Sequence, residues 1–284
     1  MNISRFKILV LCFILLPVIR LSAQLTTMQN VPVMRSDSAF ITDTYFPAVT
    51  LLYAQDDSGT MKMRCTATAF EKVDGGYLFV SAAHCATDKD GQKHEEIENA
   101  AFFVTPDENS GEKTFLRAAT VACGHKDRSD DFCVFYVKTA QKFPVVSMGD
   151  DSTNMAGEEV VNVASPEGLG KQVFYGRITM AKLDRSVVID DINWSRTVLL
   201  QLPGTNGGSS GSAIICLSQH AVCAFLVGII SDTTVVGIPV SRFKAFLHDV
   251  KTCEAKNYIL DTNAAEDGFS YHCPSASEKK TLAK

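Results

Sequence analysis

The sequence lacks several features that would point to common protein classes. It has no internal repeat, which excludes collagen-like, coiled-coil and low-complexity chains. Charged residues make up only 21% of the 284 positions and the formal net charge is −5, so disorder is not the dominant state. No excess of basic residues is present either. A general nucleic-acid binder needs a positive face for phosphates, so we expect no nucleic-acid partner.

Apolar runs of membrane-spanning length are also missing. The run Ile8–Ile19 follows Arg5 and Lys7 and is ended by Arg20, and the small residue Ala23 comes shortly after. This run is shorter than the roughly 20 residues that span a bilayer. The pattern therefore predicts a cleaved secretory signal over residues 1–23 rather than a retained anchor. We expect a secreted or periplasmic protein with no stable membrane span after cleavage.

The cysteines are not arranged for zinc. Of the nine, Cys12 lies in the predicted signal, which leaves eight in the mature chain. An even number in an exported chain indicates disulfides, although spacing alone does not give their connectivity. No CxxC pair is present, so we expect no metal site, and nothing in the sequence implies a cofactor.

What the sequence does contain is a series of short apolar segments separated by turn formers, which favours an all-β barrel or sandwich. One helix is predicted from Ser241, where Ser caps it and Phe243, Phe246 and Val250 share a face. The predicted strands are Phe46–Tyr53, Arg64–Phe70, Gly76–Ala82, Phe132–Val137, Glu159–Ala164, Gln172–Met180, Arg196–Leu202, Ala213–Cys216 and Ala221–Ser231.

Three positions carry residues suited to nucleophilic catalysis. His84 follows an apolar strand, Asp130 and Asp131 open another, and Ser210 lies in the glycine-rich loop Gly207–Ala213. A serine hydroxyl needs a base to take its proton, an imidazole supplies that base near neutral pH, and a carboxylate orients the imidazole. Each signal is weak alone, but the order His, Asp, Ser is specific.

These motifs resemble the chymotrypsin-fold (trypsin-like) serine proteases. The stretches Cys65–Thr68 and Ser81–Cys85 resemble the histidine hairpin of that family, and Gly208–Ala213 resembles its nucleophile loop. The stretches Ala164–Leu169 and Gly237–Val240 are closest to the bacterial HtrA/Do-like branch, without the PDZ domain that usually follows the protease there.

The resemblance implies two six-stranded antiparallel Greek-key β-barrels, a C-terminal helix and an endopeptidase that acts on proteins or peptides. It implies this division of the chain: signal 1–23, extension 24–44, protease domain 45–252 and tail 253–284. Within the domain, the first barrel covers about 45–145, the second about 157–240, and the helix 241–252.

The resemblance also assigns roles to residues. His84 is the general base, Asp131 the orienting acid and Ser210 the nucleophile, and Asp130 is the rival for the acid. The backbone N–H groups of Gly208 and Ser210 form the oxyanion hole. Ser209 stands where many members hold an aspartate that pairs with a new N-terminus. We therefore expect no activating cut.

The resemblance places the primary specificity pocket at Gly204, Thr205 and Ile230, whose uncharged side chains favour small or apolar residues at the cleaved position. Ser231, Asp232 and Thr233 are expected to offer backbone hydrogen bonds to an extended substrate.

One disulfide is implied by the family and three follow from proximity in the chain. Cys65–Cys85 matches the family's brace of the histidine hairpin, and closing a loop of about 20 residues stabilises by about 3 kcal/mol in the chain-entropy model. Proximity pairs Cys216 with Cys223, Cys123 with Cys133, and Cys253 with Cys273.

Two other functions fit parts of the sequence. Gly207–Gly211 also matches the Gly-x-Ser-x-Gly elbow of α/β-hydrolase esterases, with Ser209 as nucleophile. That elbow requires a helix after it, whereas Ala213–Cys216 reads as a strand. A non-catalytic peptide-binding protein on the protease fold is the other alternative, because fold does not guarantee activity.

Overall fold

The computed structural model describes most of the chain between residues 35 and 260. The described ranges are 35–56, 58–86, 101–105, 114–124, 130–183, 187–189, 192–194, 196–252 and 259–260. The predicted signal and the predicted pair of Cys253 with Cys273 lie outside them. No helix within these ranges is both long enough and apolar enough to cross a membrane.

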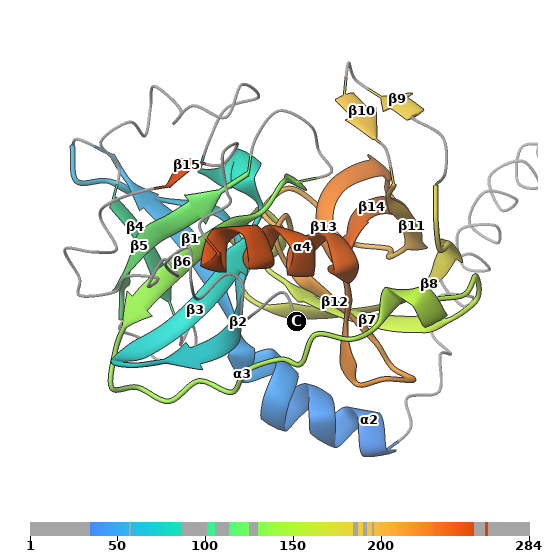
Figure 1. Cartoon of the computed structure of the whole chain (residues 1–284), viewed down its shortest axis with the longest axis horizontal. Coiled ribbons are helices and arrows are strands. Elements are labelled where there is room, and N and C mark those ends of the chain that lie inside the picture. Colours follow the sequence, from blue (N-terminus) through green and yellow to red (C-terminus); the bar gives the residue numbers. More distant parts are fainter. Residues whose placement is uncertain are drawn as a thin grey trace, which may run out of the picture. The chain divides into compact units, whose positions relative to one another are not determined.

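Six antiparallel strands of the N-terminal half close into barrel 1 (Figure 1). They pair in the order β5-β4-β1-β2-β3-β6, and β5 also pairs with β6, which closes the cycle. The short β15 (Ile259–Leu260) adds to β5. The barrel strands are β1 (Val49–Gln55), β2 (Met61–Val73), β3 (Gly76–Ser81), β4 (Ala101–Thr105), β5 (Leu116–Cys123) and β6 (Cys133–Lys138).

Six further antiparallel strands close into barrel 2 in the order β11-β14-β13-β12-β7-β8. A separate two-stranded hairpin, β9 (Val187–Ile189) with β10 (Ile192–Trp194), stands at the top of Figure 1. The predicted fold of two six-stranded barrels with a C-terminal helix is confirmed. The barrel strands are β7 (Glu159–Ala164), β8 (Gln172–Met180), β11 (Val198–Gln201), β12 (Ala213–Cys216), β13 (Ala221–Ser231) and β14 (Thr234–Pro239).

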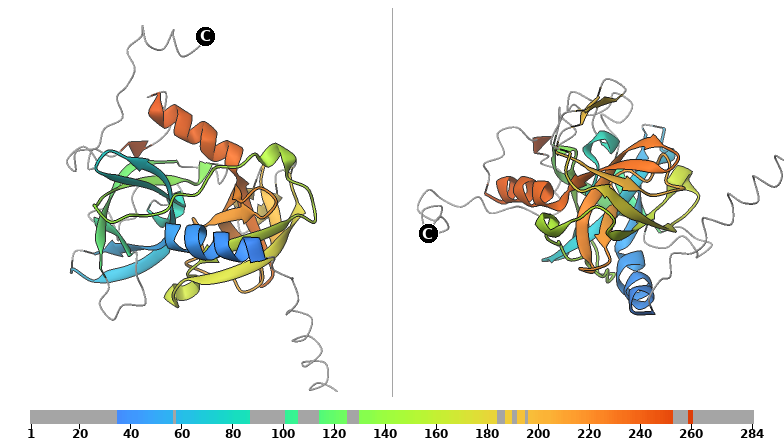
Figure 2. Two further views of the ribbon diagram at one scale, coloured as in Figure 1. Left: turned by 90° about the horizontal axis from the view of Figure 1, so that it is seen from below. Right: turned by 90° about the vertical axis from the view of Figure 1, so that its right-hand side faces the viewer.

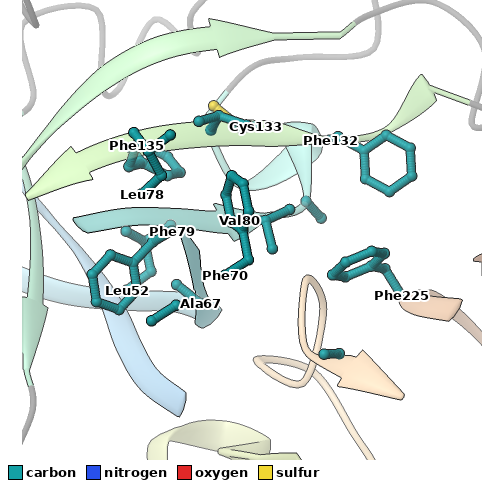
Figure 3. Packing of buried hydrophobic residues seen from close by; sticks show 14 of the residues in the cluster. Leu52, Ala67, Phe70, Leu78, Phe79, Val80, Phe132, Cys133, Phe135 and Phe225 are labelled. Carbon is teal, nitrogen blue, oxygen red and sulfur yellow. The ribbon is translucent and has the colours of Figure 1, made fainter. Parts of the chain in front are cut away.

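The hydrophobic core continues from barrel 1 into barrel 2. Phe132, at the entry to β6, meets Phe225 of β13 edge to face with ring centroids 5.6 Å apart (Figure 3). Both rings also contact Phe243 of the C-terminal helix, at 5.2 and 5.0 Å. Buried aromatic pairs of this kind add about 0.5–1.5 kcal/mol beyond the area they bury. They therefore fix the backbone beside Asp131.

The C-terminal helix α4 (Val240–Lys251) buries Phe243, Phe246 and Val250, as its pattern predicts. It begins at Val240, one residue before the predicted start, and Ser241 does not cap it. The Ser241 hydroxyl instead donates to Asp151 Oδ2 at 2.7 Å. A long-range contact has replaced the local cap that the sequence favours.

The chain is helical from residue 35, where the described part begins, to residue 48. α2 (Arg35–Phe40), the π-helical turn η1 (Ile41–Tyr45) and α3 (Phe46–Ala48) follow one another. The first strand was predicted from Phe46 but begins at Val49. Pro47 explains the difference, because it lacks the N–H of a sheet ladder and suits the first turn of a helix. Figure 2 shows this segment and α4 on the outside of the barrels.

Tyr45 anchors the helical segment to barrel 2. Its fully buried hydroxyl donates to the Ala213 carbonyl of β12 and accepts from the Val163 N–H of β7 at 2.9 Å. Burial raises the pKa of Tyr45 above its ordinary range, so the hydroxyl stays protonated and keeps donating. Ala213 lies three residues after Ser210, so this contact supports the strand that leaves the nucleophile loop.

Replacing Tyr45 with phenylalanine is expected to lower the free energy of unfolding by about 1–3 kcal/mol, because it leaves the buried Val163 N–H without an acceptor. Urea denaturation of the purified protein measures this change. Tyr77→Phe is the matched control, since the Tyr77 hydroxyl has no hydrogen bond within the described ranges. Equal losses in the two variants would contradict the role given to the Tyr45 hydroxyl.

Candidate active site

His84 lies on a short 3-10 turn, η2 (Ala83–Cys85), directly after β3. Its Nδ1 is 2.6 Å from Asp131 Oδ2, and its backbone N–H donates to Asp131 Oδ1 at 2.8 Å. The side chain of Asp131 is 4% exposed and that of His84 is 28% exposed. A buried carboxylate beside Nδ1 keeps the proton on that nitrogen, which leaves Nε2 able to accept a proton.

The neighbouring acid Asp130 has a different partner. Its Oδ1 accepts a hydrogen bond from Arg242 Nη2 of α4 at 2.6 Å. The two adjacent carboxylates therefore point to different elements, and only Asp131 reaches His84. This geometry favours Asp131 over its rival as the orienting acid.

A disulfide braces the turn that carries His84. The sulfurs of Cys65 on β2 and Cys85 on η2 are bonded. The Ser81 hydroxyl donates to the Thr66 carbonyl at 2.8 Å, which adds a second link between the same elements. Cys123–Cys133 and Cys216–Cys223 are also bonded in the structure.

The loop that carries Ser210 lies against β2 and against the end of β3, just before the turn that carries His84. The Thr66 N–H donates to the Ser210 carbonyl at 3.0 Å. Gly211 has a φ of +81°, and a Cβ added there would lie 2.4 Å from both Ser81 Oγ and the Ala82 nitrogen. Only glycine permits this approach. The structure thus brings Ser210 next to the segment that leads into His84.

The N–H groups of Gly208 and Ser210 belong to peptide groups whose carbonyl oxygens, those of Gly207 and Ser209, accept hydrogen bonds from elsewhere in the protein. The Gly207 carbonyl accepts from the Glu167 N–H at 2.6 Å, and the Ser209 carbonyl accepts from the Ser212 N–H at 3.2 Å. In a trans peptide the N–H points away from the carbonyl. Both N–H groups are therefore oriented before any substrate binds, as an oxyanion hole requires.

Thr66 is a residue of this site that sequence reasoning missed. Its buried hydroxyl donates to the Gly208 carbonyl at 2.9 Å and accepts from the Ser165 N–H at 3.1 Å. It therefore joins the nucleophile loop of barrel 2 to a strand of barrel 1. In the sequence it is one threonine in an alternating strand, with no signal that sets it apart.

Ser209 does not match an esterase nucleophile. It is fully buried, and its Oγ accepts a hydrogen bond from the Asn206 N–H at 3.3 Å. Strand β12 follows the loop where an α/β-hydrolase elbow needs a helix. The esterase hypothesis is therefore wrong for this fold.

The predicted pocket residues lie around one end of barrel 2. A Cβ added to Gly204 would lie 3.2 Å from Phe174 Cε1, so this ring occupies the space that a side chain at 204 would enter. The Thr205 hydroxyl is buried and donates to the Leu202 carbonyl at 2.9 Å. Phe174, on β8, was not identified from the sequence.

The predicted main-chain binding segment lies beside these residues. β13 ends at Ser231, and the Thr233 carbonyl accepts from the Leu202 N–H at 2.9 Å, two residues before Gly204. Ile230 is 40% exposed and Asp232 is also exposed. The contact places the turn after β13 next to the Gly204 segment.

Among the described residues, one cluster has ligand atoms close enough for a metal ion. The atoms of Cys65, His84 and Cys85 lie within 4.8 Å of one another. The two sulfurs are bonded to each other, and Nδ1 of His84 faces Asp131. Disulfide sulfur is not a thiolate ligand, so this oxidised cluster is not a candidate metal centre.

Comparison with known proteins identifies similar domains. A family model described as "Trypsin-like peptidase domain" matches residues 65–225. No curated protein matches the chain.

Among solved structures, the HtrA-type protease AlgW with tripeptide is 16% identical, with a TM-score of 0.57, 75% of this chain covered and 62% of that chain. AlgW with decapeptide is 15% identical, with the same TM-score, 75% of this chain covered and 66% of that one. The chain thus spans just under two thirds of the length of these structures, and the likeness is one of fold.

Proposed function

The chain belongs to the trypsin-like peptidase family, and from this premise we propose that it is a serine endopeptidase with His84, Asp131 and Ser210 as its triad. The observation that carries the proposal is the buried Asp131 carboxylate, which contacts both the ring and the backbone of His84. A purely structural histidine has no need of two hydrogen bonds to one buried carboxylate. The pair supports a base held in one tautomer and one orientation.

The proposed reaction proceeds through an acyl-enzyme. Ser210 Oγ attacks the substrate carbonyl carbon while His84 Nε2 takes the hydroxyl proton, and Asp131 stabilises the imidazolium that forms. The carbonyl oxygen becomes an oxyanion that accepts from the N–H groups of Gly208 and Ser210. His84 then gives the proton to the departing amine. Water, deprotonated by His84, releases the acid product and restores Ser210.

The pocket favours small or apolar side chains at the cleaved position. Gly204 offers no charge, the Phe174 ring fills the space beside it, and the Thr205 hydroxyl already donates to the protein. Gly204, Phe174 and Thr205 offer no charged partner to a lysine, arginine or acidic side chain, and a charge that loses water without a partner costs several kcal/mol. The exposed end of β13 and Ser231–Thr233 would bind the substrate backbone as an added strand.

Export fits the same proposal. The N-terminal pattern predicts a secretory signal, and three disulfides occur within the described ranges. Disulfides persist in oxidising compartments. We therefore expect a secreted or periplasmic protein.

Labelling by a fluorophosphonate tests the function directly. We expect the probe to modify Ser210, as located by peptide mass spectrometry, and to be lost in Ser210→Ala but retained in the matched surface variant Ser218→Ala. Positional-scanning peptides should then be cleaved after Ala, Val or similar residues. A folded protein that binds peptides but takes no label would support the non-catalytic alternative instead. Preferred cleavage after Lys or Glu would contradict the proposed pocket.

A further inference from the structure

Glu167 has a strained backbone next to the proposed oxyanion hole. It lies in the turn η6 (Pro166–Gly168) with φ 51° and ψ 19°, in the left-handed region. This region is unfavourable for a residue with a Cβ, and glutamate lacks the short side chain that helps Asn or Asp to adopt it. Strain of this kind persists where surrounding contacts enforce it, often at functional sites.

Two contacts of Glu167 hold the nucleophile loop. Its N–H donates to the Gly207 carbonyl at 2.6 Å, and its Oε1 accepts from Asn206 Nδ2 at 2.5 Å. Asn206 Oδ1 in turn accepts from the Gly207 N–H at 2.8 Å. The backbone and the carboxylate of one residue thus hold both ends of the Asn206–Gly207 segment.

Asn206 is also held within the loop, because its N–H donates to Ser209 Oγ at 3.3 Å and its carbonyl accepts from the Ser209 N–H at 3.0 Å. These two contacts do not involve the Gly207–Gly208 peptide group, whose carbonyl accepts from the Glu167 N–H. The Gly207–Gly208 peptide lies between two glycines, which rotate at low cost. A Cβ added to Gly207 would meet no atom within 4 Å, so packing does not restrain that side of the loop. If this peptide turned over, the Gly207 carbonyl would point where the Gly208 N–H now points. An acceptor would then replace a donor at the site of the developing oxyanion.

We propose that Glu167 is a positioning residue, which keeps the Gly208 N–H directed at the oxyanion through its own N–H to Gly207 and its carboxylate link to Asn206. This inference rests on the proposed function, because it concerns a donor of that reaction. Glu167 makes both contacts from its left-handed backbone conformation. Glu167 does not touch the reacting atoms itself.

Kinetics of three variants test the proposal. Glu167→Gly accepts the left-handed backbone but removes the carboxylate, and we expect kcat to fall roughly 10- to 100-fold with KM nearly unchanged, since an oriented oxyanion donor acts mainly in the transition state. Asn206→Ala removes the same link from the other side and should have a similar effect. Glu167→Gln keeps an acceptor for Asn206 and should stay within about threefold of the native kcat, as a rescue by the conservative variant.

The kcat of the double variant Glu167→Gly with Asn206→Ala distinguishes a positioning role of Glu167 from a general loss of protein stability. If the two residues act as one link, it should be no slower than either single variant. Binding of a peptide aldehyde, which forms the tetrahedral oxyanion, should weaken by the same factor as kcat, while urea midpoints stay close to the native value.

A native kcat in Glu167→Gly would overturn this inference, and so would fully additive losses. Failure of the proposed function has a different signature: the native protein itself would neither cleave peptides nor take a fluorophosphonate on Ser210. Loss of kcat in proportion to a lowered folded fraction would likewise reject positioning, because a merely structural role gives that result.

Discussion

Ser210→Ala is expected to lower kcat by about 10⁶-fold, a loss matched only by replacement of its proposed base, His84. The reason is that, in the proposed mechanism, the attacking oxygen is Ser210 Oγ, which alanine lacks. In measured triads, removal of the nucleophile alone costs as much as removal of all three residues. The loss of kcat can be measured with a chromogenic peptide ester and with a peptide substrate, in assays run long enough to detect the slow variant.

The residual rate is as informative as the loss. Orientation by the N–H groups of Gly208 and Ser210 survives in Ser210→Ala, so about 10³-fold catalysis over water should remain. His84→Ala should fall to the same level, and the double variant should be no slower. Activity within tenfold of the native protein in Ser210→Ala would reject Ser210 as the nucleophile, provided that circular dichroism shows the variant folded.

Asp131→Asn is expected to lower kcat by about 10⁴-fold with the fold intact. The amide NH₂ would donate to Nδ1 of His84, which moves the ring proton to Nε2. That nitrogen could then no longer accept the Ser210 proton. Steady-state kinetics near neutral pH, together with unfolding curves, would separate this loss from a loss of folded protein.

Asp130→Asn is the matched control for that experiment. It makes the same chemical change one residue away, at a carboxylate that pairs with Arg242 rather than with His84. We expect its kcat to stay within about tenfold of the native value, with a modest fall in stability from a weakened, partly exposed ion pair. The reverse ranking of the two variants would assign the orienting role to Asp130.

The site depends on contacts between barrels as well as on its three named residues. Asp131 precedes Phe132, whose ring packs against Phe225 of barrel 2 and Phe243 of α4. Thr66 of barrel 1 holds the loop of barrel 2 through the Gly208 and Ser210 carbonyls. Because close-packed cores resist small displacements, these contacts preserve the alignment of the two halves of the site.

Local patterns in the sequence determined much of this protein. Alternating apolar residues between turn formers predicted the strands, since burying one face of each strand is a local requirement. The order of His84, Asp131 and Ser210, together with the glycines beside Ser210, predicted the chemistry. The same patterns misplaced the boundary at Phe46, where Pro47 lies in the first turn of α3, and the cap at Ser241, whose hydroxyl contacts Asp151.

Only the tertiary structure decided what holds the site in place. Thr66 and Gly208 are 142 positions apart, Tyr45 and Ala213 are 168 apart, and Glu167 and Asn206 are 39 apart. No local periodicity links such pairs, because each contact forms only when the barrels close and pack. The sequence alone thus determined which residues are suited to the chemistry, and folding decided which groups orient them.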